Sequence, residues 1–146
     1  MTVKRMDNVG IVVDDLDAVI AFFVELGLEL EGTGTVQGAW VDATIGLADA
    51  RCDIAMLRTP DGHSRLELSR FRAPAVIRRT PDPAPVNALG YLRVMFAVDD
   101  LRAVVARLED CGATLVGEIA RYEDAYLLCY IRGPEGIIVG LAEQLP

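Results

Sequence analysis

Residues Val13-Asp14-Asp15-Leu16 recur later in the chain as Val98-Asp99-Asp100-Leu101, at an offset of 85 residues. The glycine at position 27 recurs at the same offset, at position 112. Between these marks, both copies carry apolar residues at i, i+3, i+4 and i+7, which predicts one amphipathic helix in each copy. The chain is therefore predicted to contain an internal structural repeat.

The ends of the two helices are predicted from residue type. Asp14 and Asp99 are expected to be the N-caps, because a carboxylate accepts the free amide protons of a helix's first turn. Gly27 and Gly112 are expected to follow the last turns, because glycine enters the left-handed region at little cost. Each helix is thus predicted to lie between an Asp-Asp pair and a glycine.

Runs of β-favouring residues surround each predicted helix. Predicted strands precede the helices at 8–13 and 92–98, and they follow at 28–31, 52–58 and 65–71 in the first copy and at 114–119, 126–132 and 137–142 in the second. Each copy is therefore predicted to be a βαβββ module. The fold class is α+β, with two tandem βαβββ modules forming a curved mixed sheet around a cavity and helices outside.

One domain, 1–146, is predicted to contain both modules. The first module spans 6–71 and the second spans 90–144. The segment 72–89 between them holds four prolines, which keep it out of regular structure, so it is predicted to be a linker that also packs across the surface.

The composition excludes several classes of protein. Of the 146 residues, 52% are hydrophobic and 25% are charged, which excludes a disordered chain. The net charge of −8 argues against non-specific binding to nucleic acid or to an anionic membrane. No apolar run approaches the roughly 20 residues of a membrane span. The first seven residues lack the apolar core of a signal peptide, and three cysteines without CxxC spacing are typical of reduced thiols, so a cytoplasmic location is predicted.

The stretch from Met6 to Leu16 resembles the opening of the vicinal oxygen chelate superfamily, which includes glyoxalase I, extradiol dioxygenases and bleomycin-binding resistance proteins. The resemblance continues through 65–68, 95–101 and 132–136 and covers nearly the whole chain in order. It implies the paired-module fold, a small-molecule ligand in the cavity and a homodimer. It leaves open whether modules pair within one chain or by exchange between two.

Metal-dependent members of this superfamily use a His in each first strand and a carboxylate in each last strand. The resemblance places these four positions on Asn8, Arg93, Glu67 and Gly140, so only Glu67 keeps a ligand of the expected type. Arg93 carries only hydrogen-bond donors and a fixed positive charge, which repels a cation. We therefore expect no metal and no cofactor.

The predicted ligand-binding residues are those with polar or aromatic chemistry at or near the cavity strands: Asn8, Trp40, Met56, Glu67, Arg93, Met95 and Tyr126. Glu67 is either a base or acceptor in the cavity, or a structural residue that pairs with Arg93. Arg93 either binds a ligand oxygen or makes that ion pair. Trp40 is placed in a glycine-rich loop that contains Gly32, Gly34 and Gly38, where a large apolar ring has few reasons to join a core.

Other reactive residues are assigned ordinary roles. The single histidine, His63, follows Asp61-Gly62 and is expected to be an exposed turn residue. Cys129 is expected to be a buried, inert thiol. Tyr122 and Tyr130 are further candidates for stacking on a planar ligand.

Two functions follow from these residues. The favoured one is metal-independent binding of an aromatic or hydrophobic small molecule, with resistance by sequestration as its biological extension. The alternative is an enzyme of the lyase, isomerase or dioxygenase type. It would use Glu67 as base with Arg93 as oxyanion stabiliser, or a non-standard metal site of Asn8, Glu67 and Glu143. A third interpretation is a small dimeric protein whose pocket serves regulation or has no present role.

Overall fold

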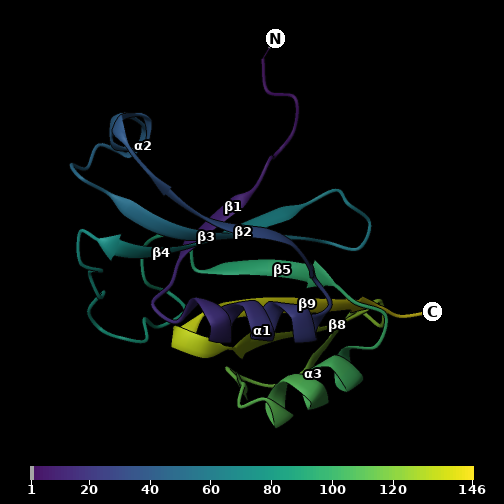
Figure 1. The fold of residues 1–146 in the computed structure, drawn as a ribbon. Coiled ribbons are helices and arrows are strands. Elements are labelled where there is room, and N and C mark those ends of the chain that lie inside the picture. The colour runs from purple at the N-terminus through teal and green to yellow at the C-terminus, as the bar shows by residue number, and fades with distance from the viewer. Residues whose placement is uncertain (1) are drawn as a thin grey trace. The chain divides into compact units, whose positions relative to one another are not determined.

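The structure is a computed structural model that describes residues 2–146. The chain divides into two compact units, one reaching to Ile77 and the other running from Arg78 to Pro146 (Figure 1). Each unit holds its own sheet and its own buried apolar residues. No helix within the described part of the chain is long and apolar enough to cross a membrane.

The first unit is a four-stranded mixed sheet with a long helix on one face. Its elements are β1 (Val9–Val12), α1 (Leu16–Leu26), β2 (Glu29–Gln37), α2 (Ala39–Ile45), β3 (Arg51–Arg58) and β4 (Arg65–Ala73). The strand order is β1-β4-β3-β2, and only the β1–β4 pair is parallel. A parallel pair needs a crossover, and the chain from β1 to β4 includes α1 for that purpose.

The second unit repeats this plan. Its elements are β5 (Arg93–Ala97), α3 (Leu101–Asp110), β6 (Thr114–Leu115), β7 (Ala120–Tyr122), β8 (Tyr126–Arg132), a 3-10 turn (Pro134–Gly136) and β9 (Ile138–Gln144). The order is β5-β9-β8-β6, with β7 also paired to β8, and only β5–β9 is parallel. The predicted α+β class and the strand–helix–strands repeat are confirmed. The joint curved sheet around a cavity involves both units together and stays a prediction.

Each helix buries one apolar face against its own sheet. In α1 the buried residues are Val19, Phe22, Phe23 and Leu26, and in α3 they are Leu101, Val104, Val105 and Leu108. On the sheets, side chains that alternate along a strand are buried beneath the helix, as Leu66 and Leu68 are in β4. A fully buried Leu or Phe side chain stabilises a fold by about 1.5–3 kcal/mol, so these faces hold each helix to its sheet.

The helix caps lie one residue later than the sequence predicts. Asp15 Oδ1 accepts the Ala18 amide at 3.1 Å, and Asp100 Oδ1 accepts the Ala103 amide at 3.0 Å. The prediction of Asp14 and Asp99 as N-caps is therefore wrong. In each pair the second aspartate directly precedes the first helical residue, from where its carboxylate reaches the third amide of the helix.

Gly27 and Gly112 take the backbone conformation that was predicted for them. Their φ angles are +126° and +94°, and each follows the last turn of its helix. Glycine adopts positive φ without the penalty that a Cβ atom brings. Both helix ends are therefore where the sequence predicts them.

The glycine-rich stretch after α1 differs most from its prediction. It is not a loop, because β2 runs to Gln37, and Gly32 and Gly34 pair with Met56 and Ile54 of β3. Backbone pairing to a neighbouring strand holds this stretch extended despite its weak intrinsic preference. The helix α2 then begins directly after Gly38, where none was predicted.

The proline-rich segment has no helix or strand between Ala73 and Arg93. Its second half is tied to the second unit by Arg132, whose Nη2 donates to the Ala84 carbonyl at 2.8 Å. Arg132 Nη1 also donates to the Gly136 carbonyl at 3.1 Å, so one guanidinium joins this segment to the turn before β9. The segment is therefore packed against the protein surface there.

Candidate functional site

The helix-free face of the first sheet carries Glu67 at its centre. In the register, Glu67 of β4 lies opposite Gly10 of β1 and Met56 of β3, and Met56 lies opposite Gly32 of β2. Glu67 alternates with the buried Leu66 and therefore points away from α1. A Cβ atom at Gly10 or at Gly32 would meet nothing within 4 Å, so open space flanks Glu67 and Met56.

The Glu67 carboxylate is half-buried and has no close partner in its own unit. Among residues 2–77, no hydrogen bond or ion pair joins it to another side chain. Cys52 lies on the same face, and burial, followed by the charges of Asp53 and Glu67, raises the pKa of its thiol. This face therefore offers a carboxylate acceptor beside a methionine and an inert thiol.

Asn8 and Trp40 lie at the margins of this face. Asn8 is exposed and directly precedes β1, two residues before Gly10 and on the same side of the strand. Trp40 is 65% exposed and belongs to α2, beyond the Gln37 end of β2. Gln37 lies five residue steps along β2 from Gly32, about 17 Å at the rise of a strand, so Trp40 is not brought next to Glu67.

The helix-free face of the second sheet brings Arg93, Met95 and Tyr130 together. Met95 of β5 lies opposite Gly140 of β9, which in turn lies opposite Tyr130 of β8. The Arg93 guanidinium carbon lies 4.9 Å from the centre of the Tyr130 ring, a cation–π contact. The predicted ion pair between Arg93 and Glu67 joins the two units and stays a prediction.

Tyr126 lies at the other end of β8 from this cluster. It pairs with Tyr122 across the β7–β8 ribbon, and the two side chains are 38% and 54% exposed. Tyr126 lies four residue steps along β8 from Tyr130, about 13 Å. Tyr126 and Tyr122 are register partners at the end of the β7–β8 ribbon and lie apart from the Arg93–Tyr130 contact.

The four positions of a superfamily-type metal centre do not fit a cation here. Gly140 holds in β9 the place that Glu67 holds in β4, since each lies opposite the middle of its parallel first strand. Gly140 has no ligand atom, and the Met95 side chain fills the space, so that a Cβ there would meet Met95 Cγ at 3.2 Å. Arg93 brings a fixed positive charge to the same face. Half of the ligand set is therefore replaced by an apolar contact and a cation.

The non-standard metal set is also unsupported. Glu143 Oε2 accepts the Leu101 amide at 2.7 Å and so serves as a second cap of α3. In β9 this residue alternates with Ala142 and lies on the α3 side of the sheet, together with the buried Leu141. Within residues 2–146, no three His, Cys, Asp or Glu side chains gather in a way that could hold a metal ion.

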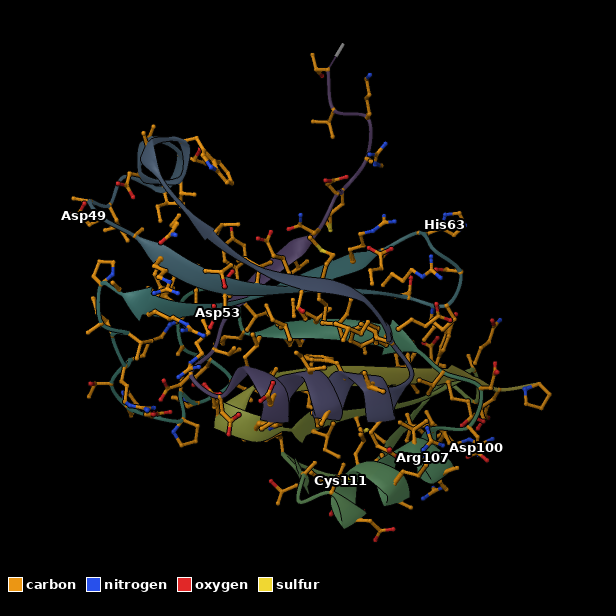
Figure 2. All side chains as sticks on the ribbon, viewed as in Figure 1. Asp49, Asp53, His63, Asp100, Arg107 and Cys111 are labelled. Atoms are coloured by element: carbon orange, nitrogen blue, oxygen red, sulfur yellow. The ribbon has the colours of Figure 1, made fainter. Side chains whose placement is uncertain are left out.

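His63 and Cys129 occupy the positions predicted for them. His63 is exposed in the turn between β3 and β4 (Figure 2), where its amide donates to Asp61 Oδ1 at 3.0 Å. Cys129 is buried, and burial raises the pKa of its thiol. Neither side chain is positioned as a nucleophile or as its activating base.

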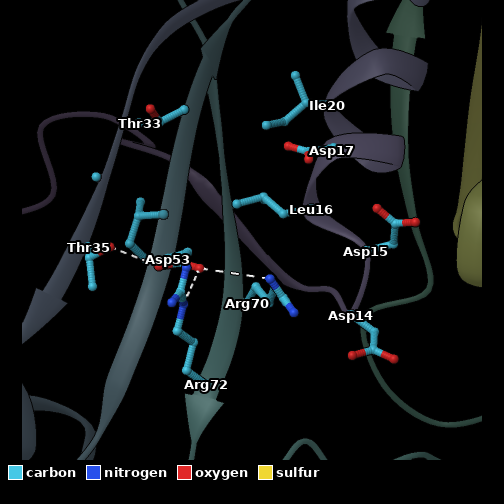
Figure 3. Close-up of a pocket in the computed structure, with 12 residues that line it drawn as sticks. Asp14, Asp15, Leu16, Asp17, Ile20, Thr33, Thr35, Asp53, Arg70 and Arg72 are labelled. Atoms are coloured by element: carbon cyan, nitrogen blue, oxygen red, sulfur yellow. Dashed lines mark hydrogen bonds and ion pairs between the residues drawn. The ribbon is translucent and has the colours of Figure 1, made fainter.

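A pocket that the sequence analysis missed lies on the α1 side of the first sheet (Figure 3). Its volume is about 650 Å³, and none of the predicted ligand-binding residues lines it. At its wall, Asp53 accepts Arg72 Nε at 2.6 Å and Thr35 Oγ1 at 2.8 Å, and Arg70 Nη1 lies 4.0 Å away. No signal in the sequence indicated this cluster, because Arg72 was assigned to the linker at 72–89 and Thr35, whose strand β2 pairs with β3, was assigned to a loop.

This cluster predicts a loss of stability in acid. The hydrogen bond from Arg72, followed by that from Thr35, holds the pKa of Asp53 below its ordinary value of 3.8. A depressed native pKa stabilises the folded state above the unfolded pKa, and that stabilisation is lost as the pH falls through the native pKa. We expect the melting temperature of Asp53→Asn to fall less than that of the wild type between pH 6 and pH 3, roughly the range in which an aspartate titrates. Arg72→Gln should flatten the profile in the same way, and parallel profiles for all three proteins would contradict the expectation.

Comparisons with known proteins agree with this architecture. Residues 7–130 match the family model described as the glyoxalase/bleomycin resistance protein/dioxygenase superfamily. A glyoxalase family protein from Bacillus cereus has 56% sequence identity and a TM-score of 0.96, with coverage of 100% of this chain and 97% of that one. No curated protein matches the chain.

More distant structures share the fold alone. The trypanothione-dependent glyoxalase I of Leishmania major has 17% identity and a TM-score of 0.67, over 97% of this chain and 87% of that one. A glyoxylase/bleomycin resistance protein/dioxygenase domain from Frankia has 16% identity and a TM-score of 0.67, over 98% and 93% of the two chains. At these identities the likeness concerns the arrangement of helices and strands and not the chemistry.

Proposed function

Because the chain belongs to the glyoxalase/bleomycin resistance protein/dioxygenase superfamily, we propose that it binds an aromatic or hydrophobic small molecule without a metal ion, at the helix-free faces of its sheets. The observation that carries the proposal is the replacement at Gly140, where Met95 packs in the place of a carboxylate ligand. The Arg93 guanidinium over Tyr130 supports it further, because a fixed cation opposes a metal ion and attracts a ligand oxygen.

The proposed ligand is recognised mainly by soft apolar contacts. Met56 and Met95 offer polarisable thioethers that adapt to planar rings, and the Tyr130 ring adds an aromatic surface. Glu67 and Arg93 supply one acceptor and one set of donors, which would orient a polar group on the ligand. Sequestration of a toxic compound by a cytoplasmic homodimer belongs to the same proposal.

A second candidate, an enzyme, is favoured by one feature of Glu67. A half-buried carboxylate without a partner in its own unit is available as a general base. In an enzyme, Glu67→Gln would abolish turnover and leave binding in place. In a binding protein, the same change weakens binding, because it removes a charged acceptor.

The test uses the methionine methyl groups as reporters. In protein labelled with 13C at these methyls, planar aromatic fragments that carry one carboxylate for Arg93 and one N–H or O–H donor for Glu67 should shift the signals of Met56 or Met95. Met6, which is 76% exposed and precedes β1, serves as the internal control. Fragments that shift none of these signals, or Met6 alone, would contradict binding at the helix-free faces.

A variant and a metal assay complete the test. Glu67→Gln should weaken binding of the best fragment about tenfold or more, the effect of losing a hydrogen bond to a charged group. The exposed Glu109→Gln on α3 should leave binding unchanged. Elemental analysis of protein purified without chelator should find far less than one metal ion per chain, and a stoichiometric ion would refute metal-independent binding.

A further inference from the structure

We propose that the pocket between the start of α1 and strands β2–β4 binds a small zwitterion, with its carboxylate at Arg70 and Arg72 and its ammonium group at the acidic wall opposite. The pocket lies on the α1 side of the first sheet, whereas Glu67 and Met56 face the other side. The inference is therefore independent of the function proposed above.

The basic wall of the pocket consists of Arg70 and Arg72, and their guanidinium groups have hydrogen-bond donors that Asp53 does not use. Asp53 is the less exposed partner, with 14% of its side chain accessible, against 47% for Arg70 and 48% for Arg72. Arg72 donates to Asp53 through Nε alone, so both of its terminal nitrogens remain as donors for a ligand. Arg70 approaches the same carboxylate to 4.0 Å without a hydrogen bond. Two guanidinium groups share one carboxylate, which leaves a surplus positive charge and a fork that suits a second carboxylate.

The acidic wall faces this pair across the pocket. Asp14, Asp15 and Asp17 line it from the turn before α1 and from its first turn, and Figure 3 shows the Arg70 guanidinium extending from β4 toward that side. Asp15 also caps α1, but a carboxylate has lone pairs for a second donor. The lining holds four aspartates and two arginines, a net charge of −2, so a dianion is disfavoured and a ligand with a cationic far end is favoured.

The space between the two walls is partly apolar. Leu16 and Ile20 line it from α1, and Thr33 lines it from β2. Its volume of about 650 Å³ lies within the range of small-molecule sites. These features favour a ligand whose charged ends are joined by a short hydrocarbon chain.

A series of ω-amino acids tests the inference directly. Titration calorimetry at low ionic strength would compare 4-aminobutanoate, 6-aminohexanoate and 8-aminooctanoate, since salt screens exposed charges. Each is paired with the carboxylic acid and the amine of the same chain length, which keep one charge each. We expect one length to bind at least tenfold more tightly than both of its singly charged counterparts. Equal affinity of acid and amino acid, or no binding by any length, would overturn the proposal.

Matched variants locate the site. Arg70→Gln removes no hydrogen bond of the folded protein, so it should keep the fold and lose at least tenfold in affinity. Asp17→Asn should lose affinity for the amino acid and leave that for the plain acid unchanged. Arg102→Gln, on the exposed side of α3, and Glu67→Gln should bind like the wild type. If Arg70→Gln also binds like the wild type, the zwitterion does not occupy this pocket.

Discussion

Replacing Gly136 by alanine is expected to lower the free energy of unfolding by about 2–4 kcal/mol, through backbone strain and overpacking together. Gly136 has a φ of +75°, and a Cβ atom there would lie 2.7 Å from Cβ of Pro83 and 3.6 Å from its Cα. Pro83 cannot move aside as a flexible side chain would, because its Cβ belongs to the ring. Relief therefore requires the proline-rich segment to leave the turn before β9.

Gly62 provides a matched control for this prediction. It has the same φ of +75°, but a Cβ atom there would meet nothing within 4 Å. Gly62→Ala should therefore show the backbone strain alone, about 1–2 kcal/mol. Urea unfolding of both variants isolates the contribution of the contact with Pro83. Equal destabilisation of the two variants would show that the segment around Pro83 is not packed against Gly136.

The repeat was predictable because its signals are local. Helical spacing after each Asp-Asp pair and a glycine at each helix end are enough to predict α1 and α3. The offset of 85 residues also predicts which residues are equivalent on the first strands. Gly10 and Met95 are related by this offset, and each lies opposite the middle of the last strand of its own unit, Gly10 opposite Glu67 and Met95 opposite Gly140. The equivalence of Glu67 and Gly140, on which the metal argument depends, has a different offset of 73 residues and came from matching 138–141 to 65–68 under the family resemblance.

What could not be predicted depends on contacts between distant segments. The later part of β2 contains glycines, which have little preference for strands, so no local signal predicts a strand there. It is extended because it pairs with β3. The carboxylate of Asp53 gathers Thr35, Arg70 and Arg72 from two other strands, and no spacing along the chain reveals such a cluster. The N-caps were predicted one residue too early, because the two aspartates of each Asp-Asp pair have the same capping chemistry. Only the position of the first helical residue shows which of them is the cap.

Truncation of Leu68 or Leu141 to alanine is expected to have the largest effect on stability, about 3–5 kcal/mol each. Both side chains are fully buried, and each follows the repeat-equivalent position, Glu67 in β4 and Gly140 in β9. Each side chain packs on the helix side of its own sheet, so its removal leaves a cavity under α1 or α3. In a domain of this length, such a loss should lower the melting temperature by roughly 6–20 °C.

Val24→Ala is the control, because Val24 lies on α1 with 47% of its surface exposed and should change stability by less than about 0.5 kcal/mol. Since Leu68 and Leu141 have the same burial at equivalent positions, both destabilisations should lie within the range of about 3–5 kcal/mol. Denaturant unfolding of the three variants measures this. A destabilisation below about 1.5 kcal/mol at only one of the two sites would mean that its core relaxes around the cavity. The two halves of the repeat would then share their strand pairing without sharing the rigidity of their cores.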